Sequence, residues 1–282
     1  MPRPLIKWVG GKQWMLGALK PLLPKRWNVW HEPFVGAGGM LFGCSPAKAR
    51  INDINWMLVN LHRQTKDRPS DLWRRAGEAG PWDSCDLEAF LLRRETFNRM
   101  LREREETLDS AAMMIWISRH CFNGLYRVNG RGEFNSPWNR NASKPVLRTE
   151  AEFLECSAVL KNAEIFSADF EKFLEPVQAG DFVFFDPPYV PDAVSGDFTS
   201  YSKEGFGRED HVRTAEAARM LAERGAYVMA TNNDSPWTRE LYNGFRFFEF
   251  GTNTGIRAGR KRREAAILSY EPEGLDGIGR FC

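Results

Sequence analysis

The stretch that most constrains this chain runs from Asp181 to Tyr189 and reads DFVFFDPPY. Its middle part, Phe182 to Asp186, is an apolar run ending in a carboxylate, a pattern typical of a strand buried on both faces of a sheet. Two prolines then end the strand, because proline cannot donate to a β-ladder and its φ is fixed. We therefore expect a stiff tip that projects Asp186 and Tyr189 from the carboxyl end of a strand, where open α/β sheets bind their ligands.

This tip carries groups that suit a planar base with an exocyclic amino group. The Asp186 carboxylate and the Pro187 carbonyl can each accept one N–H, and Tyr189 can stack on the ring. Accepting both hydrogens favours a pyramidal nitrogen with a free lone pair. That nitrogen can attack an electrophilic methyl placed in line by direct displacement, so positioning supplies most of the rate. The alternative is an ordinary strand end followed by a core tyrosine, since a short motif stays a hypothesis until its context agrees.

The composition predicts a globular protein with uneven surface charge. The chain has 282 residues, 43% hydrophobic and 27% charged, enough for one large domain or for one domain with a sizeable insertion. The formal net charge is only +2, but basic residues cluster at 127–140 and 257–263. Such patches suit a polyanion, although either cluster alone is more typical of a solvated surface.

The five cysteines and four histidines are dispersed, and no spacing among them indicates a zinc site. An odd number of cysteines without a secretory signal indicates reduced thiols, and no apolar run approaches a membrane span. We therefore expect a cytoplasmic protein with neither a metal centre nor a membrane partner.

A first glycine-rich turn lies in residues 5–12, which read LIKWVGGK. Its spacing is not that of a P-loop, so we do not expect a nucleoside-triphosphate site. The glycines let the backbone approach a ligand closely, while Trp8 offers a flat face and Lys12 a cation. A helix over 13–23 should follow.

A second glycine-rich turn follows a predicted strand over 29–32 and contains Gly36 and Gly38. This pattern is typical of the first βα turn of a Rossmann-like nucleotide-binding unit, although a lone Gly-x-Gly falls short of a dinucleotide fingerprint.

Two later strands also end in acidic residues. The strand after the second glycine turn ends at Asp53, which is placed either to accept hydrogen bonds from a ribose or to cap the helix that begins near Asn55. A further strand ends at Asp169 and Phe170, which could hold the amino group and the face of an adenine ring.

Between Asp67 and about Arg148 the alternation of strands and helices stops, and charged amphipathic segments predict helices over 70–77, 86–106 and 107–121. They lead into a loop, 119–140, in which Asn129-Gly130 predicts a two-residue hairpin turn. The loop interleaves arginines and aromatic residues, namely Arg127, Arg131, Arg140, Phe122, Tyr126, Phe134 and Trp138. Arginine can read guanine edges and aromatic rings can wedge between bases, whereas a structural hairpin with surface arginines is the alternative.

After Thr149 the alternation returns. We expect helices over 149–160, 207–224 and 235–242, and strands over 163–167, 226–231, 245–250 and 264–270. Residues 190–206 form a long glycine- and serine-containing loop, which we interpret as a mobile lid.

Taken together, these motifs resemble the Dam-type DNA N6-adenine methyltransferases, which use S-adenosylmethionine. The matching segments span residues 5–272 in the family's order: Lys7 to Lys12, Glu32 to Gly38, Asn52 to Asn55, Asn123 to Arg140, Ser167 to Phe170, Asp186 to Tyr189, Phe198 to Tyr201, and Gly259 to Arg263.

The resemblance implies roles for individual residues. It places the catalytic tetrapeptide at Asp186, Pro187, Pro188 and Tyr189. It implies that S-adenosylmethionine is contacted by Trp8, Lys12, Phe34, Gly36, Gly38, Asp53, Asp169, Phe170 and Asp186.

For double-stranded DNA, the resemblance implies contacts from Phe122, Asn123, Arg127, Asn129, Pro137 and Arg140. Phe122 lies where relatives often have an intercalating tyrosine, so the wedge is kept and a hydroxyl is lost. Such relatives commonly target GATC, and Arg127, Pro137 and Arg140 favour that site, while residues 136–140 depart in detail from the relatives.

The predicted architecture is α/β: a Rossmann-like class I methyltransferase domain formed by residues 1–55 and 146–272, whose mixed sheet has one antiparallel strand near its C-terminal edge. A helical target-recognition insertion occupies 56–145 with its hairpin at 122–140, and 273–282 form a flexible tail. We expect a monomer that flips adenine out of the duplex, encoded by a phage, a host chromosome or a restriction system.

The rival enzymes methylate cytosine N4, a glutamine amide or RNA adenine, and a rival of another class is a non-catalytic DNA-binding protein. By resemblance, an aspartate at position 186 speaks against the first two. The fit of the hairpin to duplex readers disfavours RNA, and an intact catalytic tetrapeptide disfavours the non-catalytic relative.

Overall fold

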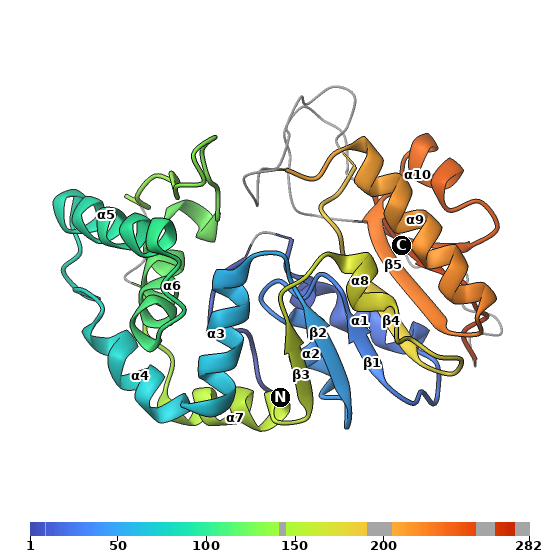
Figure 1. Cartoon of the computed structure of the whole chain (residues 1–282), viewed down its shortest axis with the longest axis horizontal. Coiled ribbons are helices and arrows are strands. Elements are labelled where there is room, and N and C mark those ends of the chain that lie inside the picture. Colours follow the sequence, from blue (N-terminus) through green and yellow to red (C-terminus); the bar gives the residue numbers. More distant parts are fainter. Residues whose placement is uncertain (9, 141–144, 191–204, 252–262, 274–282) are drawn as a thin grey trace.

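The computed structural model describes residues 1–8, 10–140, 145–190, 205–251 and 263–273, and within them the strands form one seven-stranded sheet in the order β3-β2-β1-β4-β5-β7-β6 (Figure 1). The strands are β1 (Trp30–Glu32), β2 (Ala49–Asn52), β3 (Ala163–Phe166), β4 (Phe182–Phe185), β5 (Tyr227–Asn233), β6 (Arg246–Gly251) and β7 (Arg263–Leu268). Neighbouring strands from β3 to β5 are parallel, whereas β7 is antiparallel to both β5 and β6. The mixed sheet with one reversed strand near the C-terminal edge is confirmed.

The chain reverses its direction of travel through the sheet at β1. From β1 it moves outward through β2 to β3, and it then returns to place β4 on the other side of β1, with Trp30 opposite Phe182. The crevice outside the carboxyl ends of β1 and β4 is therefore the topological switch point, where folds of this kind bind their ligands.

Strand β4 is buried on both faces, as its unbroken apolar sequence predicts. Phe182 and Phe184 belong to one hydrophobic cluster, and Val183 and Phe185 belong to the cluster on the opposite face. Alternate side chains of a strand point to opposite faces, so this one strand ties both layers of helices to the sheet.

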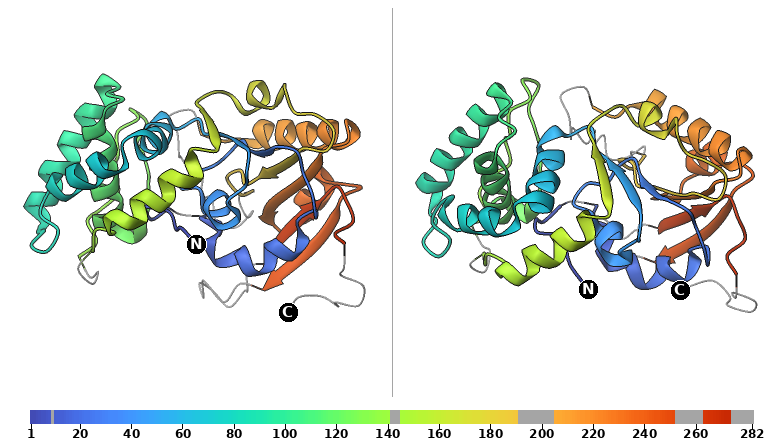
Figure 2. Two further views of the ribbon diagram at one scale, coloured as in Figure 1. Left: turned by 90° about the horizontal axis from the view of Figure 1, so that it is seen from below. Right: turned by 60° about the horizontal axis from the view of Figure 1, so that its bottom comes forward.

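Helices cover both faces of the sheet (Figure 2). The first cluster is built from β-strand side chains together with residues of η1 (Lys12–Met15), α1 (Leu16–Leu19), η2 (Lys20–Leu22), α2 (Gly39–Cys44), α3 (Trp56–Asp67) and α7 (Glu150–Leu160). The second is built with α8 (Phe170–Leu174), α9 (Arg208–Glu223) and the end of α10 (Pro236–Leu241).

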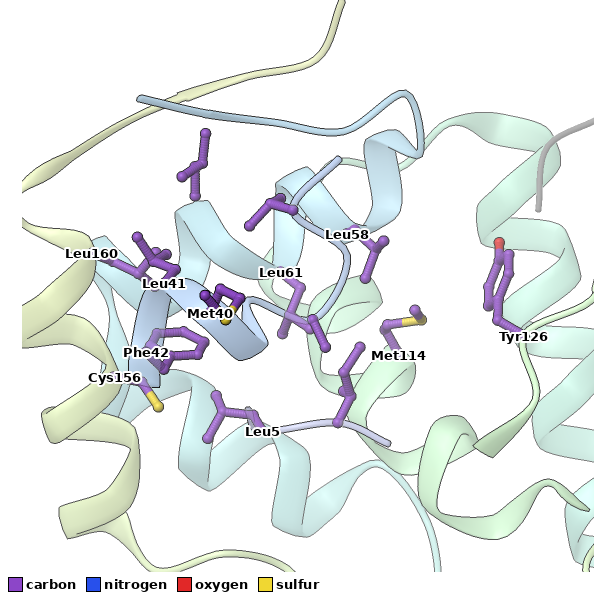
Figure 3. Packing of buried hydrophobic residues seen from close by; sticks show 14 of the residues in the cluster. Leu5, Met40, Leu41, Phe42, Leu58, Leu61, Met114, Tyr126, Cys156 and Leu160 are labelled. Atoms are coloured by element: carbon purple, nitrogen blue, oxygen red, sulfur yellow. The ribbon is translucent and has the colours of Figure 1, made fainter. Parts of the chain in front are cut away.

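A group of helices extends to one side of the sheet, away from α9 and α10 (Figure 1). It contains α4 (Pro69–Glu78), α5 (Leu87–Glu103), α6 (Leu108–His120) and the short η3 (Phe122–Gly124). Its core is continuous with that of the sheet, because Leu58 and Leu61 of α3 pack in the same cluster as Met40 of α2 and Met114 of α6 (Figure 3). Helix α3 thus joins the two parts.

The helices differ from the prediction in two places. The single helix expected over 13–23 is divided into η1, α1 and η2, with Pro21 in the first turn of η2, where its missing N–H cannot continue an α-helical ladder. Helix α8 was not predicted, because a helix of five residues is too short to show periodicity.

The turn of the hairpin also differs from the prediction. Asn129 N donates to Glu133 O (2.9 Å), so the loop contains Gly130, Arg131 and Gly132 rather than two residues. The left-handed residue is Gly132 (φ 81°), and the Asn129 side chain accepts from the backbone N–H groups of Arg131 and Glu133 (2.9 and 3.0 Å). Asn129 therefore organises the turn from outside it, as asparagine does in Asx turns.

Within the described ranges, no helix is long and apolar enough to cross a membrane, and no cluster of histidine, cysteine and acidic side chains could hold a metal ion.

Candidate active site

Three acidic side chains meet at the switch point, because each lies at the carboxyl end of a neighbouring strand. Glu32 ends β1, Asp53 follows β2 and Asp186 follows β4. Burial raises the pKa of Glu32 to about 8 and that of Asp53 to about 6. The protein thus gathers carboxyl groups at a place where water solvates their charged forms poorly, so Glu32 keeps its proton at neutral pH.

Asp186 is held at one of its two carboxylate oxygens. Lys12 Nζ lies 2.6 Å from Oδ1, and Thr231 Oγ1 donates to the same atom over 2.7 Å. The described residues supply no donor to Oδ2, and the side chain is 18% exposed. One oxygen is therefore anchored, while the other can accept a hydrogen bond from a ligand.

The charge on Asp186 depends on its neighbours. Burial raises the pKa of Asp186, whereas the Lys12 ammonium and the Thr231 hydroxyl act in the opposite direction. Lys12 is only 3% exposed and also donates to the carbonyl of Gly10, so the first glycine turn fixes the cation beside the carboxylate. Lys12 and Thr231 thus offset part of the effect of burial on this carboxyl.

Tyr189 is fixed at its hydroxyl and is covered on its ring. The hydroxyl donates to Glu264 Oε2 over 2.8 Å, and Lys12 Nζ lies 4.7 Å from the ring centroid. Burial, reinforced by Asp186 and Glu264, holds the pKa of Tyr189 well above its usual value, so the phenol stays protonated. The next residue, Val190, donates its N–H to the Asn232 side chain over 3.1 Å, and the tip is therefore supported from β5 and β7.

The second glycine turn lies beside this tip. Gly36 (φ 50°) donates its N–H to Asp53 Oδ2 over 2.9 Å, while Asp53 Oδ1 accepts from Asn55 N over the same distance. The cap of α3 is Asn55, whose side chain accepts from the N–H of Met57. Asp53 therefore holds the glycine turn, and its carboxylate oxygens retain lone pairs for a further donor.

Gly38 shows why this turn needs glycine. It has φ 80°, and a Cβ placed on it would lie 2.8 Å from the Phe42 ring. Any other residue would be strained by its backbone and would collide with the core.

Asn52 was missed by the sequence analysis as a site residue. Its side chain donates to the carbonyls of Pro33 and Ala168 (3.0 Å each) and accepts from Ala168 N (2.9 Å). It therefore ties together the loops that follow β1, β2 and β3. Its sequence signal was its place at the end of a buried strand, immediately before Asp53.

Asp169 and Phe170 lie at the start of α8. The Asp169 side chain accepts from Glu171 N and forms an ion pair with Arg213, whose Nη2 lies 2.9 Å from Oδ2. Phe170 is buried against Phe34, with the ring centroids 5.2 Å apart. Both residues thus border the loop after β1, and their contact with a nucleotide stays a prediction.

The loop at 119–140, called the recognition loop after its predicted role, presents most of its predicted DNA contacts to solvent. Phe122 is 49% exposed although its backbone N–H is fixed by Pro137 O at 2.8 Å. Asn123 adopts a left-handed conformation (φ 53°), and the exposed Arg127 donates from Nε to Asn135 Oδ1 over 2.8 Å. Pro137 and Arg140 are exposed as well, whereas Asn129 is half-buried in the turn. The DNA roles of these six residues stay predictions.

Some predictions lie outside the described residues. They concern most of the expected lid (191–204), including the segment Phe198 to Tyr201, all but the last residue of the basic cluster at 257–263, and all but the first residue of the tail (274–282).

The fold and the switch-point site define a Rossmann-like methyltransferase. Residues 8–256 match the family model of the D12 class N6 adenine-specific DNA methyltransferases, and the chain therefore belongs to this family. The resemblance to Dam-type enzymes is thus confirmed.

Three relatives illustrate the range of this similarity. The chain is 37% identical to the Type II methyltransferase M1.LlaDCHI of Lactococcus lactis subsp. cremoris over 248 residues, which cover 86% of this chain and 85% of the relative. It is 30% identical to the DNA adenine methylase of Escherichia coli strain K12 over 273 residues, 96% of each chain. It is 33% identical to the DNA N-6-adenine-methyltransferase of Escherichia phage P1 over 248 residues. This alignment covers 86% of this chain but only 32% of the phage protein.

Proposed function

We propose that this protein transfers a methyl group from S-adenosylmethionine to N6 of an adenine flipped out of duplex DNA, within the sequence GATC. The observation that carries the proposal is the geometry of Asp186, which has one oxygen anchored by Lys12 and Thr231 and the other directed to no described protein donor. This half-satisfied acceptor lies at the topological switch point, beside the glycine turn.

The charge of the site fits a cationic cofactor. Glu32, Asp53 and Asp186 bring three carboxyl groups to adjacent strand ends, and burial raises the pKa of each. Lys12 is the only buried lysine or arginine in the described part of the chain. S-adenosylmethionine carries an ammonium and a sulfonium, and positive charge beside these carboxyl groups would favour their ionised forms over their protonated ones.

The protein's own groups would position the adenine amino nitrogen. Asp186 Oδ2 and the Pro187 carbonyl each accept one N–H, which frees the nitrogen lone pair, and the Tyr189 ring holds the base by stacking. Bound S-adenosylmethionine supplies an activated methyl on a sulfonium, and the sulfur keeps the electron pair of the broken bond. As the new N–C bond forms, the Asp186 carboxylate would stabilise the positive charge that grows on the nitrogen, and the surplus N6 proton would leave through this carboxylate to solvent. The transfer is direct, so no covalent enzyme intermediate is needed.

The recognition loop would deliver the adenine. Chemistry on a base in a duplex requires the base to leave the stack, and an exposed aromatic wedge can occupy the gap. Phe122 has this exposure, and the exposed Arg127 and Arg140 lie on the same loop. We assign the wedge to Phe122 and guanine reading to the arginines. We further propose that residues 56–145 act as the recognition insertion of a monomer working in the cytoplasm.

The test uses tritiated S-adenosylmethionine and matched duplexes. One contains GATC, a second contains GATC with N6-methyladenine already present on both strands, and a third carries the same bases in permuted order. After digestion to nucleosides, we expect label only in N6-methyldeoxyadenosine and only from the first duplex. Label in N4-methylcytosine, or no label at all, would contradict the proposed reaction. Equal labelling of the permuted duplex would contradict the proposed GATC specificity but would still support methylation of adenine.

A further inference from the structure

Tyr126 lies where the recognition hairpin meets the proposed cofactor pocket. It belongs to the hairpin, yet it is only 6% exposed, and its ring centroid is 5.1 Å from that of Trp8 with 31° between the planes. Figure 3 shows Tyr126 at the edge of the shared hydrophobic cluster, beyond Met114 of α6.

Trp8 connects Tyr126 to the second glycine turn. A Cβ placed on Gly36 would lie 3.3 Å from two atoms of the Trp8 indole, so the ring already lies directly against this turn. The polar end of Tyr126 faces the same region. Burial raises the pKa of its hydroxyl, and Asn55 and Asp53 are close enough to influence it. Asp53 in turn accepts from Gly36 N over 2.9 Å.

On its other side, Tyr126 packs against Phe134, which lies across the hairpin (ring centroids 5.5 Å apart). Phe134 is the rigid point of the hairpin, because its N–H and its carbonyl are both bound by the Asn98 side chain of α5 (2.7 and 3.1 Å). The rings of Trp8, Tyr126 and Phe134 therefore form a packed series from the glycine turn to the base of the hairpin.

A second contact links the same two segments. A Cβ on Gly124 would collide with the side chain of Lys7, and the Arg119 guanidinium donates to Leu5 O over 2.8 Å. The N-terminal segment that carries Trp8 therefore packs directly against the start of the recognition loop.

We infer that Tyr126 is a positioning residue that couples the cofactor pocket to the DNA-reading hairpin. A cofactor that fixes Trp8 against the Gly36 turn also fixes Tyr126, and through it the backbone of the adjacent Arg127. Coupling of this kind is reciprocal, so a bound duplex tightens cofactor binding by the factor by which the cofactor tightens duplex binding. The inference rests on the proposed function, because it requires both ligands.

The coupling is measured with S-adenosylhomocysteine, which cannot react. Its dissociation constant is determined by calorimetry with and without a saturating GATC duplex, in the wild type and in Tyr126→Phe and Tyr126→Leu. We expect the duplex to tighten binding about tenfold in the wild type. Tyr126→Phe should keep most of this factor because the ring stack remains. Tyr126→Leu should reduce it to about twofold or less, while its affinity for each ligand alone changes by less than about threefold.

A matched control and a second readout keep the test decisive. Tyr227→Leu removes a ring that packs against Tyr270 in another part of the sheet (centroids 5.3 Å apart), and it should leave the coupling factor unchanged. Hydrogen exchange on the wild type needs no variant, and we expect amides of 122–138 to gain protection when S-adenosylhomocysteine binds.

Each of three results would overturn the inference. The coupling factor could be unchanged in Tyr126→Leu, the two ligands could bind independently in the wild type, or S-adenosylhomocysteine could leave the exchange of the hairpin amides unchanged. These results differ from failure of the proposed function, in which the wild type binds no S-adenosylhomocysteine or no duplex. If Tyr126→Leu does not fold, the hydrogen-exchange result decides.

Discussion

At the scale of single residues, some groups of the site could be predicted from the sequence and others could not. Asp186 and Lys12 were expected near one ligand, and the structure brings them into direct contact. Thr231 and Glu264 were not expected, although they fix Asp186 and Tyr189. They reach the site from β5 and β7, and only the antiparallel register of these strands brings the two segments together. No local sequence pattern encodes such a long-range pairing.

The Lys12–Asp186 pair leads to a prediction about pH. Lys12 lowers the pKa of Asp186 against the effect of burial. In the proposed reaction, Asp186 must be ionised to accept a hydrogen bond from the adenine amino group. Lys12→Met therefore leaves the Asp186 pKa higher, and the acid limb of the pH profile of kcat should move up by about one pH unit at saturating cofactor. Lys12→Arg keeps the charge and serves as the control. An acid limb that stays in place in Lys12→Met would show that Lys12 does not control the ionisation of Asp186.

At the scale of elements, long and regular segments were predictable and short ones were not. Strand β4 was recognised from its apolar run. Helix α7 was expected from Thr149 onward, and the side chains of Thr149 and Glu152 cap it reciprocally. Helix α8 and the divided N-terminal helix are fixed by packing against the sheet, which the local sequence does not report. The hairpin was found, but its loop length depends on the Asn129 side chain.

The start of β4 depends on one buried carboxylate. Asp181, 4% exposed, accepts from Val29 N (3.1 Å), from Gln178 N (3.0 Å) and from His31 Nε2 (3.0 Å). Burial lowers the pKa of His31, so the imidazole is neutral and donates its single proton to Asp181.

Removing this acceptor should destabilise the fold. Asp181→Ala should lower the free energy of unfolding by about 2–4 kcal/mol in urea titrations, because three buried donors lose their partner. The control is Asp83→Ala, at an exposed position in the loop after α4. It should change the free energy of unfolding by less than about 0.5 kcal/mol. Equal stability of the two variants would show that Asp181 does not anchor β4.

At the scale of the whole molecule, the concentration of acids at the switch point should set the dependence of stability on pH. Glu32 is 2% exposed, accepts from Trp30 Nε1 over 2.7 Å, and has its pKa raised to about 8 from 4.5. Between these two values the folded protein keeps a proton that the unfolded chain releases. Stability must therefore fall as the pH rises through this window.

Glu32→Gln removes this titration and keeps an acceptor for Trp30. Melting temperatures from about pH 5 to about pH 8 should fall less steeply in the variant than in the wild type, so that the difference grows in favour of the variant with rising pH. Glu88 is exposed in the first turn of α5. The melting temperatures of Glu88→Gln should therefore change with pH in parallel with those of the wild type. Parallel curves for Glu32→Gln as well would mean that Glu32 is already ionised in the folded protein.

The central claim is that the tip of β4 carries out the chemistry while the helical side of the molecule reads the duplex. The most direct test is Asp186→Ala, measured in parallel for methyl transfer to a GATC duplex and for retardation of the same duplex in a gel. We predict that transfer falls by at least about a thousandfold, whereas the affinity for the duplex changes by less than about threefold. Substantial transfer by the variant, or equal loss of transfer and of duplex binding, would contradict the account.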